Sequence, residues 1–265
     1  MTGESLSAAA TRLHEATGMT AGNGSLMRTA PVALAYLNDP QALVRAAHDV
    51  SSLTHHDSEA GEACALWCLA IRHAVLHGTL DGLRLAVPDL PTARARVWST
   101  RLVKAEAGPP STFDRNGWVV QALQGAWSAI TRTPIPARSP ERHLQLALEA
   151  AVRGGGDTDT VAAIAGGLLG ARWGAGAIPE GWIYLLYGWP NMNATDLSTR
   201  PSASPALTDS HGAQIDHSNA FCVRRTGPCA GMRLPAATSG LARRRCQRGC
   251  RRNCSNHRSQ DDESR

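Results

Sequence analysis

Residues 154–173 read GGGDTDTVAAIAGGLLGARW, in which a glycine run and a polar segment precede a long apolar run. Three consecutive glycines allow a tight backbone turn. Polar residues follow at 157–160, and a long run rich in alanine, isoleucine and leucine comes after them. A turn, a polar start and an apolar run are typical of a buried helix, so we predict one over 158–173.

Most of the sequence before residue 190 repeats this pattern, with glycine and proline breakers between apolar segments. In 57–77, apolar residues recur at helical spacing from Ala60 through Trp67 to Val75. Thr54 and Asp57 have the spacing of a capping box just before this segment. Further helices are predicted over 26–37, 41–53, 92–105, 118–130, 141–152 and 181–187. Because no stretch alternates convincingly with the period of a strand, we predict an all-α fold in a single compact domain.

The composition changes near residue 200. All seven tryptophans lie before residue 190, whereas residues 200–265 carry twelve arginines against five acidic residues. Too few large apolar residues remain in 200–265 to offset the entropy of ordering the backbone. We therefore expect a helical domain over 1–199 and a disordered tail over 200–265. The domain is slightly acidic, which excludes a basic nucleic-acid-binding body, so we do not expect nucleic acid as a partner.

Nothing in the sequence reads as a targeting or membrane-spanning segment. The first residues, MTGESLS, carry acid where a signal peptide needs a basic residue, and 161–171 is too short to span a bilayer. Cys64 and Cys68 lie four residues apart on an apolar helical stripe, where we expect reduced thiols packed as small hydrophobes. The expected location is the cytoplasm.

Asp157, Asp159 and Thr160 place two carboxylates and a hydroxyl within four residues at the start of a helix. Such oxygen ligands suit a hard cation such as Mg²⁺. The alternative is structural: Asp157 caps the helix, and Asp159 interacts favourably with the helix dipole.

A second stretch, GNGSLMR at 22–28, combines a turn with a helix start. Free backbone N–H groups there suit phosphate or ribose hydroxyls, and Arg28 adds positive charge. The alternative is an ordinary turn with Ser25 as the helix cap. A third candidate is His55, which either contacts a ligand or has a structural role. Since His55 and His56 are adjacent, they point in different directions, and both cannot line one site.

Taken in order, these stretches resemble the ADP-ribosylglycohydrolase family, which includes the dinitrogenase reductase-activating glycohydrolases. The resemblance covers about residues 17–199. It implies a single all-α domain that hydrolyses the glycosidic bond between ADP-ribose and a protein side chain or related acceptor. The stretches that carry it are GNGSLMR at 22–28, LTH at 53–55, NGWVVQAL at 116–123, GGDTDTVAAIAG at 155–166, and the tryptophan-containing segments at 178–182 and 188–190.

The resemblance also implies which residues form the site. Family members bind two divalent ions, normally Mg²⁺, and the metal ligands implied here are Asp157, Asp159 and Thr160. The implied partners are ADP-ribosylated proteins or small molecules that contain ADP-ribose, and the acceptor group is not readable from these loops. The residues implied to line the ADP-ribose pocket are Gly22, Asn23, Gly24, Ser25, Met27, Arg28 and His55.

One family feature does not occur in this sequence. The family carries an N-terminal Thr-Asp-Asp-Thr-like motif that supplies the other half of the metal cage. Because Mg²⁺ demands near-octahedral geometry, three ligands from one loop suit at most one weakly held ion. We therefore expect an N-terminally incomplete domain with weak or lost hydrolase activity. The alternative is a non-catalytic helical module that binds ADP-ribose or a related nucleotide.

The tail leaves several interpretations open. Its arginines could contact nucleic acid phosphates, although solvated disorder is the expectation. A shifted reading frame in a GC-rich gene would also produce such a change of composition. A zinc site is the remaining alternative, although the spacing differs from the usual paired thiolates; its ligands would be Cys246, Cys250, Cys254 and His257.

Overall fold

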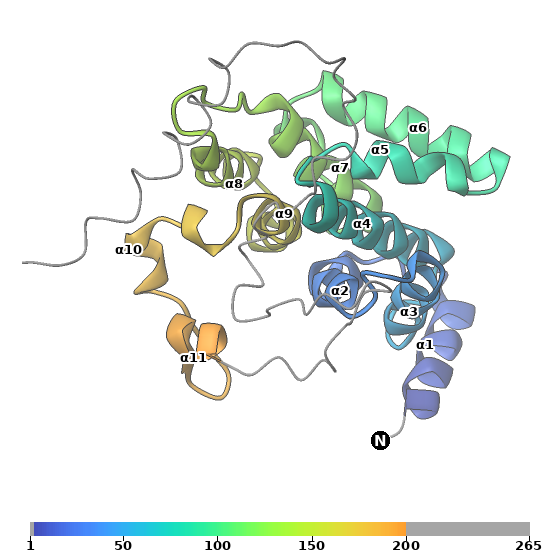
Figure 1. The fold of residues 1–265 in the computed structure, drawn as a ribbon. Helices are drawn as coiled ribbons and strands as arrows, with labels where there is room; N and C mark the ends of the chain where they lie inside the picture. The colour runs from blue at the N-terminus through green and yellow to red at the C-terminus, as the bar shows by residue number, and fades with distance from the viewer. Residues whose placement is uncertain (1–2, 200–265) are drawn as a thin grey trace, which may run out of the picture. The chain divides into compact units, whose positions relative to one another are not determined.

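The computed structural model describes residues 3–199, and all of them belong to one compact unit. Helices make up most of this part of the chain (Figure 1). The all-α prediction is therefore confirmed. The expected disorder of 200–265 and the candidate zinc ligands Cys246, Cys250, Cys254 and His257 lie outside the described residues.

The helices follow one another with short connections. The α-helices are α1 (Gly3–Thr17), α2 (Gly24–Ala35), α3 (Pro40–Ser52), α4 (Ser58–His77), α5 (Gly82–Ala86), α6 (Thr92–Ala107), α7 (Val119–Arg132), α8 (His143–Arg153), α9 (Thr158–Trp173), α10 (Glu180–Ile183) and α11 (Ala194–Thr199). Single 3₁₀ turns lie at η1 (Val87–Asp89), η2 (Pro110–Thr112), η3 (Pro140–Arg142) and η4 (Ala175–Ala177). Two short strands, β1 (Tyr187–Gly188) and β2 (Met192–Asn193), pair antiparallel.

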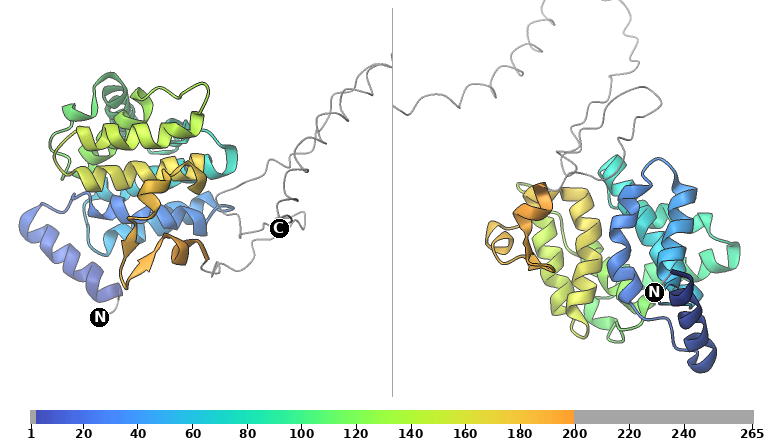
Figure 2. Two further views of the ribbon diagram at one scale, coloured as in Figure 1. Left: turned by 90° about the vertical axis from the view of Figure 1, so that its left-hand side faces the viewer. Right: turned by 90° about the horizontal axis from the view of Figure 1, so that it is seen from below.

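The core is built around α4, which packs against α2, α3, α5, α7 and α9. The views in Figure 2 show α9 beside α2, and these two helices are also in contact. Trp67 of α4 is buried between these elements, and its indole Nε1 donates to the Ile164 carbonyl oxygen of α9 at 3.0 Å. Trp98 of α6 and Trp127 of α7 are buried as well. The apolar stripe predicted for 57–77 therefore faces the centre of the domain.

The start of α4 differs from the predicted capping box. Asp57 itself is the N-cap, and its Oδ1 accepts from the Glu59 N–H at 2.8 Å. Thr54 lies before the helix and does not cap it. The helix ends at Gly78, whose φ of 65° is left-handed.

Three other parts of the described chain differ from expectation. The helix predicted over 181–187 is wrong, because only Glu180–Ile183 is helical and Tyr187 already belongs to β1. Trp189-Pro190-Asn191 makes the turn between the strands, where proline disfavours a helix and Asn191 has a left-handed φ of 79°. Helices α1 and α5 were not expected. The residues of α1 are mostly exposed, so its sequence carries a weak apolar pattern.

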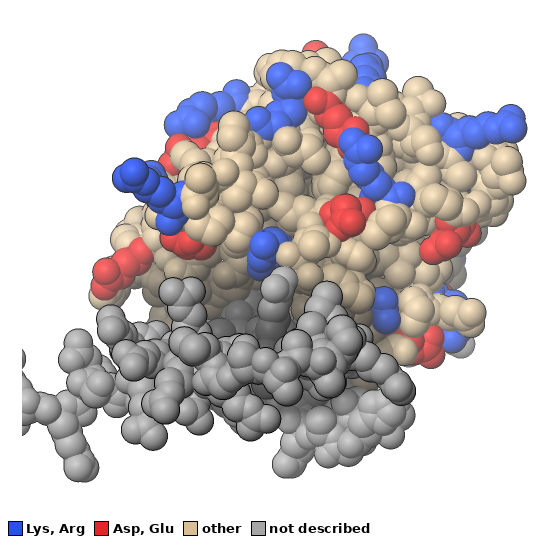
Figure 3. All heavy atoms as spheres, turned by 45° about the horizontal axis from the view of Figure 1, so that its top comes forward, with Lys and Arg blue, Asp and Glu red and all other residues tan. Residues whose placement is uncertain are grey.

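One face of the domain carries charges of both signs. On the face shown in Figure 3, acidic and basic side chains are interspersed rather than separated. Such mixing is not the pattern of a phosphate-binding basic surface. Between residues 3 and 199, no helix is both long and apolar enough to cross a membrane. Cys64 and Cys68 are free and buried, as predicted.

Candidate functional site

Loops that precede three different helices meet at the candidate site. Gly22, before α2, forms an isolated antiparallel bridge with Trp118, before α7. The Asn23 N–H donates to the Gly117 carbonyl at 3.1 Å, and the Val119 N–H donates to the Ala21 carbonyl at 2.9 Å. These backbone bonds join the 22–24 loop to the start of α7.

Two asparagine side chains connect both of these loops to the third one, before α9. Asn23 Nδ2 donates to the Asn116 carbonyl and to Asp157 Oδ2, each at 2.7 Å. Asn116 Nδ2 donates to the Gly155 carbonyl at 2.8 Å, and Asn116 Oδ1 accepts from the Asp157 N–H at 2.8 Å. Both asparagines are buried. We call Asn23, Asn116 and Asp157 the asparagine network; it holds the three loops in one arrangement.

Gly156 is required for this arrangement. Its φ of +72° is left-handed, and a Cβ added there would lie 2.4 Å from Asn116 Oδ1. Any side chain would thus strain the backbone and displace the asparagine. The glycine run seen in the sequence is what permits the loop to approach Asn116 closely.

Asp157 occupies the N-cap position of α9 but makes no capping hydrogen bond with its side chain. Its carboxylate accepts from Asn23 Nδ2 instead, so Asp157 connects two loops, and its role as a metal ligand stays a prediction. The hydrogen bond from Asn23 is the main cause that lowers the pKa of Asp157, because it stabilises the charged form. Asp157 therefore presents a carboxylate at neutral pH.

The other two predicted metal ligands lie in the first turn of α9. Asp159 is exposed, whereas Thr160 is buried. With Asp157 they provide hard oxygen donors of the kind that Mg²⁺ takes, but too few for its octahedral shell. Across residues 3–199 there is no group of three or more His, Cys, Asp or Glu arranged to hold a metal. These donors fit a partial site, and their metal binding stays a prediction.

His55 faces the glycine loop. A Cβ on Gly22 would lie 3.1 Å from His55 Nε2, and one on Gly24 would lie 3.5 Å from Cε1. Burial lowers the pKa of His55 below its ordinary 6.5, and the positive charge of Arg28 lowers it further. The imidazole is therefore neutral at pH 7 and can either donate or accept a hydrogen bond.

His56 points away from the site. Its Nδ1 lies 3.1 Å from Thr11 Oγ1 of α1, and its ring lies 5.2 Å from that of His14. The expectation that the two adjacent histidines diverge is confirmed.

The remaining residues of the predicted pocket lie on α2 itself, and some are exposed while others are buried. Arg28 is exposed, and its guanidinium donates to Thr54 Oγ1 and to the Val50 carbonyl, so it lies close to His55. Met27 is also exposed. Ser25 is buried, and Cys64 Sγ lies 3.6 Å from its Oγ. The helix N-cap is Asn23, so the alternative that Ser25 caps α2 is wrong.

Asn116 and Trp118 have positions at the site that no sequence argument assigned to them. Both belong to the NGWV stretch that carries part of the resemblance. The sequence signal that could have pointed to Asn116 was a polar residue next to a glycine, just before a predicted helix. The contacts themselves were invisible, because Asn23 and Asn116 are 93 residues apart in the chain.

Comparisons with known proteins match this chain to one family. The family model described as ADP-ribosylglycohydrolase matches residues 2–209. The ADP-ribosylarginine hydrolase Tri1 of Pseudomonas putida (strain GB-1) is 29% identical over 164 residues, which is 62% of this chain and 42% of the relative. The ADP-ribosylhydrolase ARH3 of Homo sapiens is 28% identical over an alignment of 194 residues. The match covers 61% of this chain and 52% of the relative.

A solved structure described as an ADP-ribosylglycohydrolase-related protein complex also matches. Its TM-score is 0.51 and its sequence identity 30%, and the match covers 69% of this chain and 63% of that chain. The chain spans about half the length of the curated relatives that it matches.

Proposed function

The chain belongs to the ADP-ribosylglycohydrolase family, and from that membership we propose Mg²⁺-dependent hydrolysis of the glycosidic bond in ADP-ribose conjugates. The observation that supports this most is the asparagine network, which holds the 22–28 stretch next to Asp157. The proposed partners are ADP-ribosylated proteins or small molecules that contain ADP-ribose, and the proposed location is the cytoplasm. The turnover proposed for this chain is weak.

The residues around the network have properties that suit such a ligand. The N-terminus of α2 offers backbone N–H groups and a positive dipole end to a phosphate, and exposed Arg28 adds charge one turn later. Neutral His55 beside Gly22 suits a ribose hydroxyl. Mg²⁺ held by Asp157, Asp159 and Thr160 would orient ribose hydroxyls and stabilise developing charge.

A second candidate is a non-catalytic module that binds ADP-ribose. All three predicted metal ligands come from the N-cap and first turn of one helix. Because so few donors from one segment make an incomplete metal site, this arrangement favours the module. Binding through the 22–28 stretch and His55 does not need a complete metal cage.

Calorimetry and a turnover assay on the purified chain separate these candidates. ADP-ribose is titrated with and without Mg²⁺, and peptides ADP-ribosylated on arginine or on serine are incubated with the protein. Slow hydrolysis that disappears in Asp159→Ala, and persists in the exposed control Asp89→Ala, supports the hydrolase. Binding without hydrolysis supports the module. A chain that is folded and binds no ADP-ribose contradicts both candidates.

A further inference from the structure

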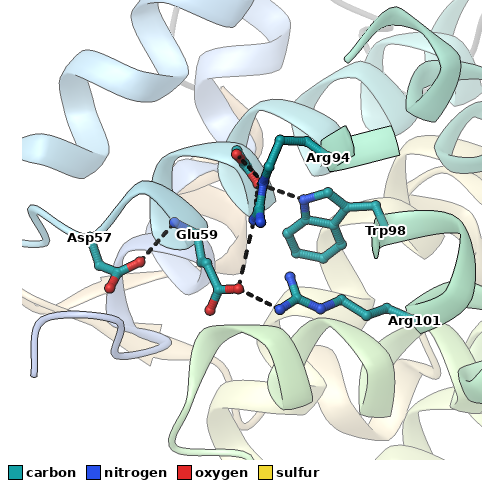
Figure 4. Close-up of polar contacts among 6 residues, drawn as sticks. Asp57, Glu59, Arg94, Trp98 and Arg101 are labelled. Carbon is teal, nitrogen blue, oxygen red and sulfur yellow. Dashed lines mark hydrogen bonds and ion pairs between the residues drawn. The ribbon is translucent and has the colours of Figure 1, made fainter. Parts of the chain in front are cut away.

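Polar contacts outside the asparagine network connect α4 to α6 (Figure 4). Asp57 caps α4 and accepts from the Glu59 N–H, so the backbone of Glu59 is held next to the connection between α3 and α4 that contains His55. Glu59 then pairs with Arg101 of α6. These contacts tie α6 to the segment that carries His55.

Arg101 also faces two tryptophan rings. Its guanidinium carbon lies 4.8 Å from the ring centre of Trp98 and 5.7 Å from that of Trp118. Within the described part of the chain, its buried Nη1 has no hydrogen-bond partner. The guanidinium lies within the range of attraction to the two indole rings, because a cation is attracted to an aromatic ring. Arg101 therefore contacts both tryptophan rings in addition to its ion pair with Glu59.

The two tryptophans are not equivalent. Trp98 is completely buried, and its Nε1 donates to Glu62 Oε2 at 2.7 Å, so the core already fixes it. Trp118 is 38% exposed, and its backbone bridges to Gly22 of the candidate site. Arg101 therefore contacts a partly exposed ring at the edge of the site.

We propose that Arg101 is a positioning residue for Trp118. It holds the indole at the edge of the candidate site, and ligand affinity depends on it through that ring. A lysine at this position keeps the charge but loses the planar group that faces both rings. The part of this proposal that concerns ligand affinity rests on the proposed function, whereas the restraint on Trp118 does not.

The restraint is tested without any ligand. The indole ¹H–¹⁵N resonance of Trp118 is assigned from its loss in Trp118→Phe and followed in Arg101→Lys. We expect it to move toward the position of a solvent-exposed indole. The matched control is Arg94→Lys, which loses the bidentate contact with Glu62 and the longer 3.6 Å contact with Glu59 but removes no contact to Trp118.

An unchanged Trp118 resonance in folded Arg101→Lys overturns the proposal, and so does an equal shift in Arg94→Lys. If Arg101→Lys does not fold, Glu59→Gln decides, because it removes the charge that orients the Arg101 guanidinium and leaves Arg101 itself in place. A smaller shift in the same direction then supports the proposal, and no shift overturns it.

The consequence for binding is tested by a double-mutant cycle with ADP-ribose. Arg101→Lys is expected to weaken binding roughly threefold to tenfold, as the loss of a cation–π restraint implies. In the Trp118→Ala background the same change is expected to have no further effect. Fully additive effects would contradict action through Trp118. If the wild-type chain does not bind ADP-ribose, the proposed function fails, and the resonance experiment still decides the restraint.

Discussion

The helical core and the candidate site are held together by different kinds of contact. In the core, α4, α7 and α9 bury apolar side chains, and Trp67 adds only one hydrogen bond to the Ile164 carbonyl. At the site, loops before three helices are joined by the amide groups of Asn23 and Asn116. Core substitutions should therefore lower the free energy of unfolding, whereas loop substitutions should affect ligand binding more strongly than stability.

The largest effect is expected for Trp67→Ala. Removing a buried indole leaves a cavity, and the expected loss in unfolding free energy is about 3–5 kcal/mol. Urea denaturation measures it. The matched control is Trp189→Ala, because Trp189 is 92% exposed and its removal should change stability by less than about 0.5 kcal/mol. Equal losses in the two variants would show that the core is not organised around Trp67.

Gly156→Ala comes next. Its left-handed φ and its clash with Asn116 together predict a loss of about 1–3 kcal/mol and a strong loss of ADP-ribose affinity. Gly155→Ala is the control, because its φ of +80° brings similar strain but a Cβ there meets nothing within 4 Å. If the two variants bind ADP-ribose equally, close approach to Asn116 does not matter for the site.

Asn23→Ala should have a smaller effect on stability. The Asn116 carbonyl and Asp157 Oδ2 both lose their donor, and the expected destabilisation is about 1–2 kcal/mol, with a larger relative loss of ADP-ribose affinity. Thermal unfolding and calorimetry measure the two effects. Asn38→Ala, at an exposed position before α3, is the control. Unchanged ADP-ribose affinity in Asn23→Ala would show that the asparagine network does not contribute to ligand binding.

The smallest effect is a pH dependence that arises from Asp157. Because its pKa is lower in the folded chain, its carboxylate contributes stability above the ordinary value of an unfolded aspartate, about 3.9. That contribution is lost as the pH falls through the lower pKa of the folded state. The stability difference between wild type and Asp157→Asn should therefore shrink below about pH 4. A difference that stays constant from neutral to acidic pH would contradict the assigned cause.

Helix positions could be predicted largely from sequence, and the reasons are local. The segments around Trp67, Trp98 and Ile164 carry an apolar pattern at helical spacing, and glycine or proline residues separate them. The hairpin near Trp189 was missed because its strands are only two residues long and leave no alternation to detect. Helix α1 was missed because it buries too little apolar surface to leave a clear pattern.

The candidate site could be predicted only in part. Its loops were recognised from glycines beside polar residues, and Asp157 and His55 were among the candidates. The role of Asn116 and the pairing of Arg101 with Trp118 were not predicted, because a sequence does not show which loops meet. The divergence of His55 and His56 was predicted, since adjacent side chains before a helix point in different directions.

The all-α class and most of the helix positions follow from local sequence, because periodicity and helix-breaking residues act within a few residues of the chain. What the polar loops do depends on contacts between parts of the chain that are far apart in sequence. Asn23 reaches the Asp157 carboxylate across 134 residues of sequence, and this contact both joins the loops and lowers the pKa of Asp157. Packing of the helices sets which loop ends meet, so the chemistry of those loops depends on contacts that no local pattern encodes.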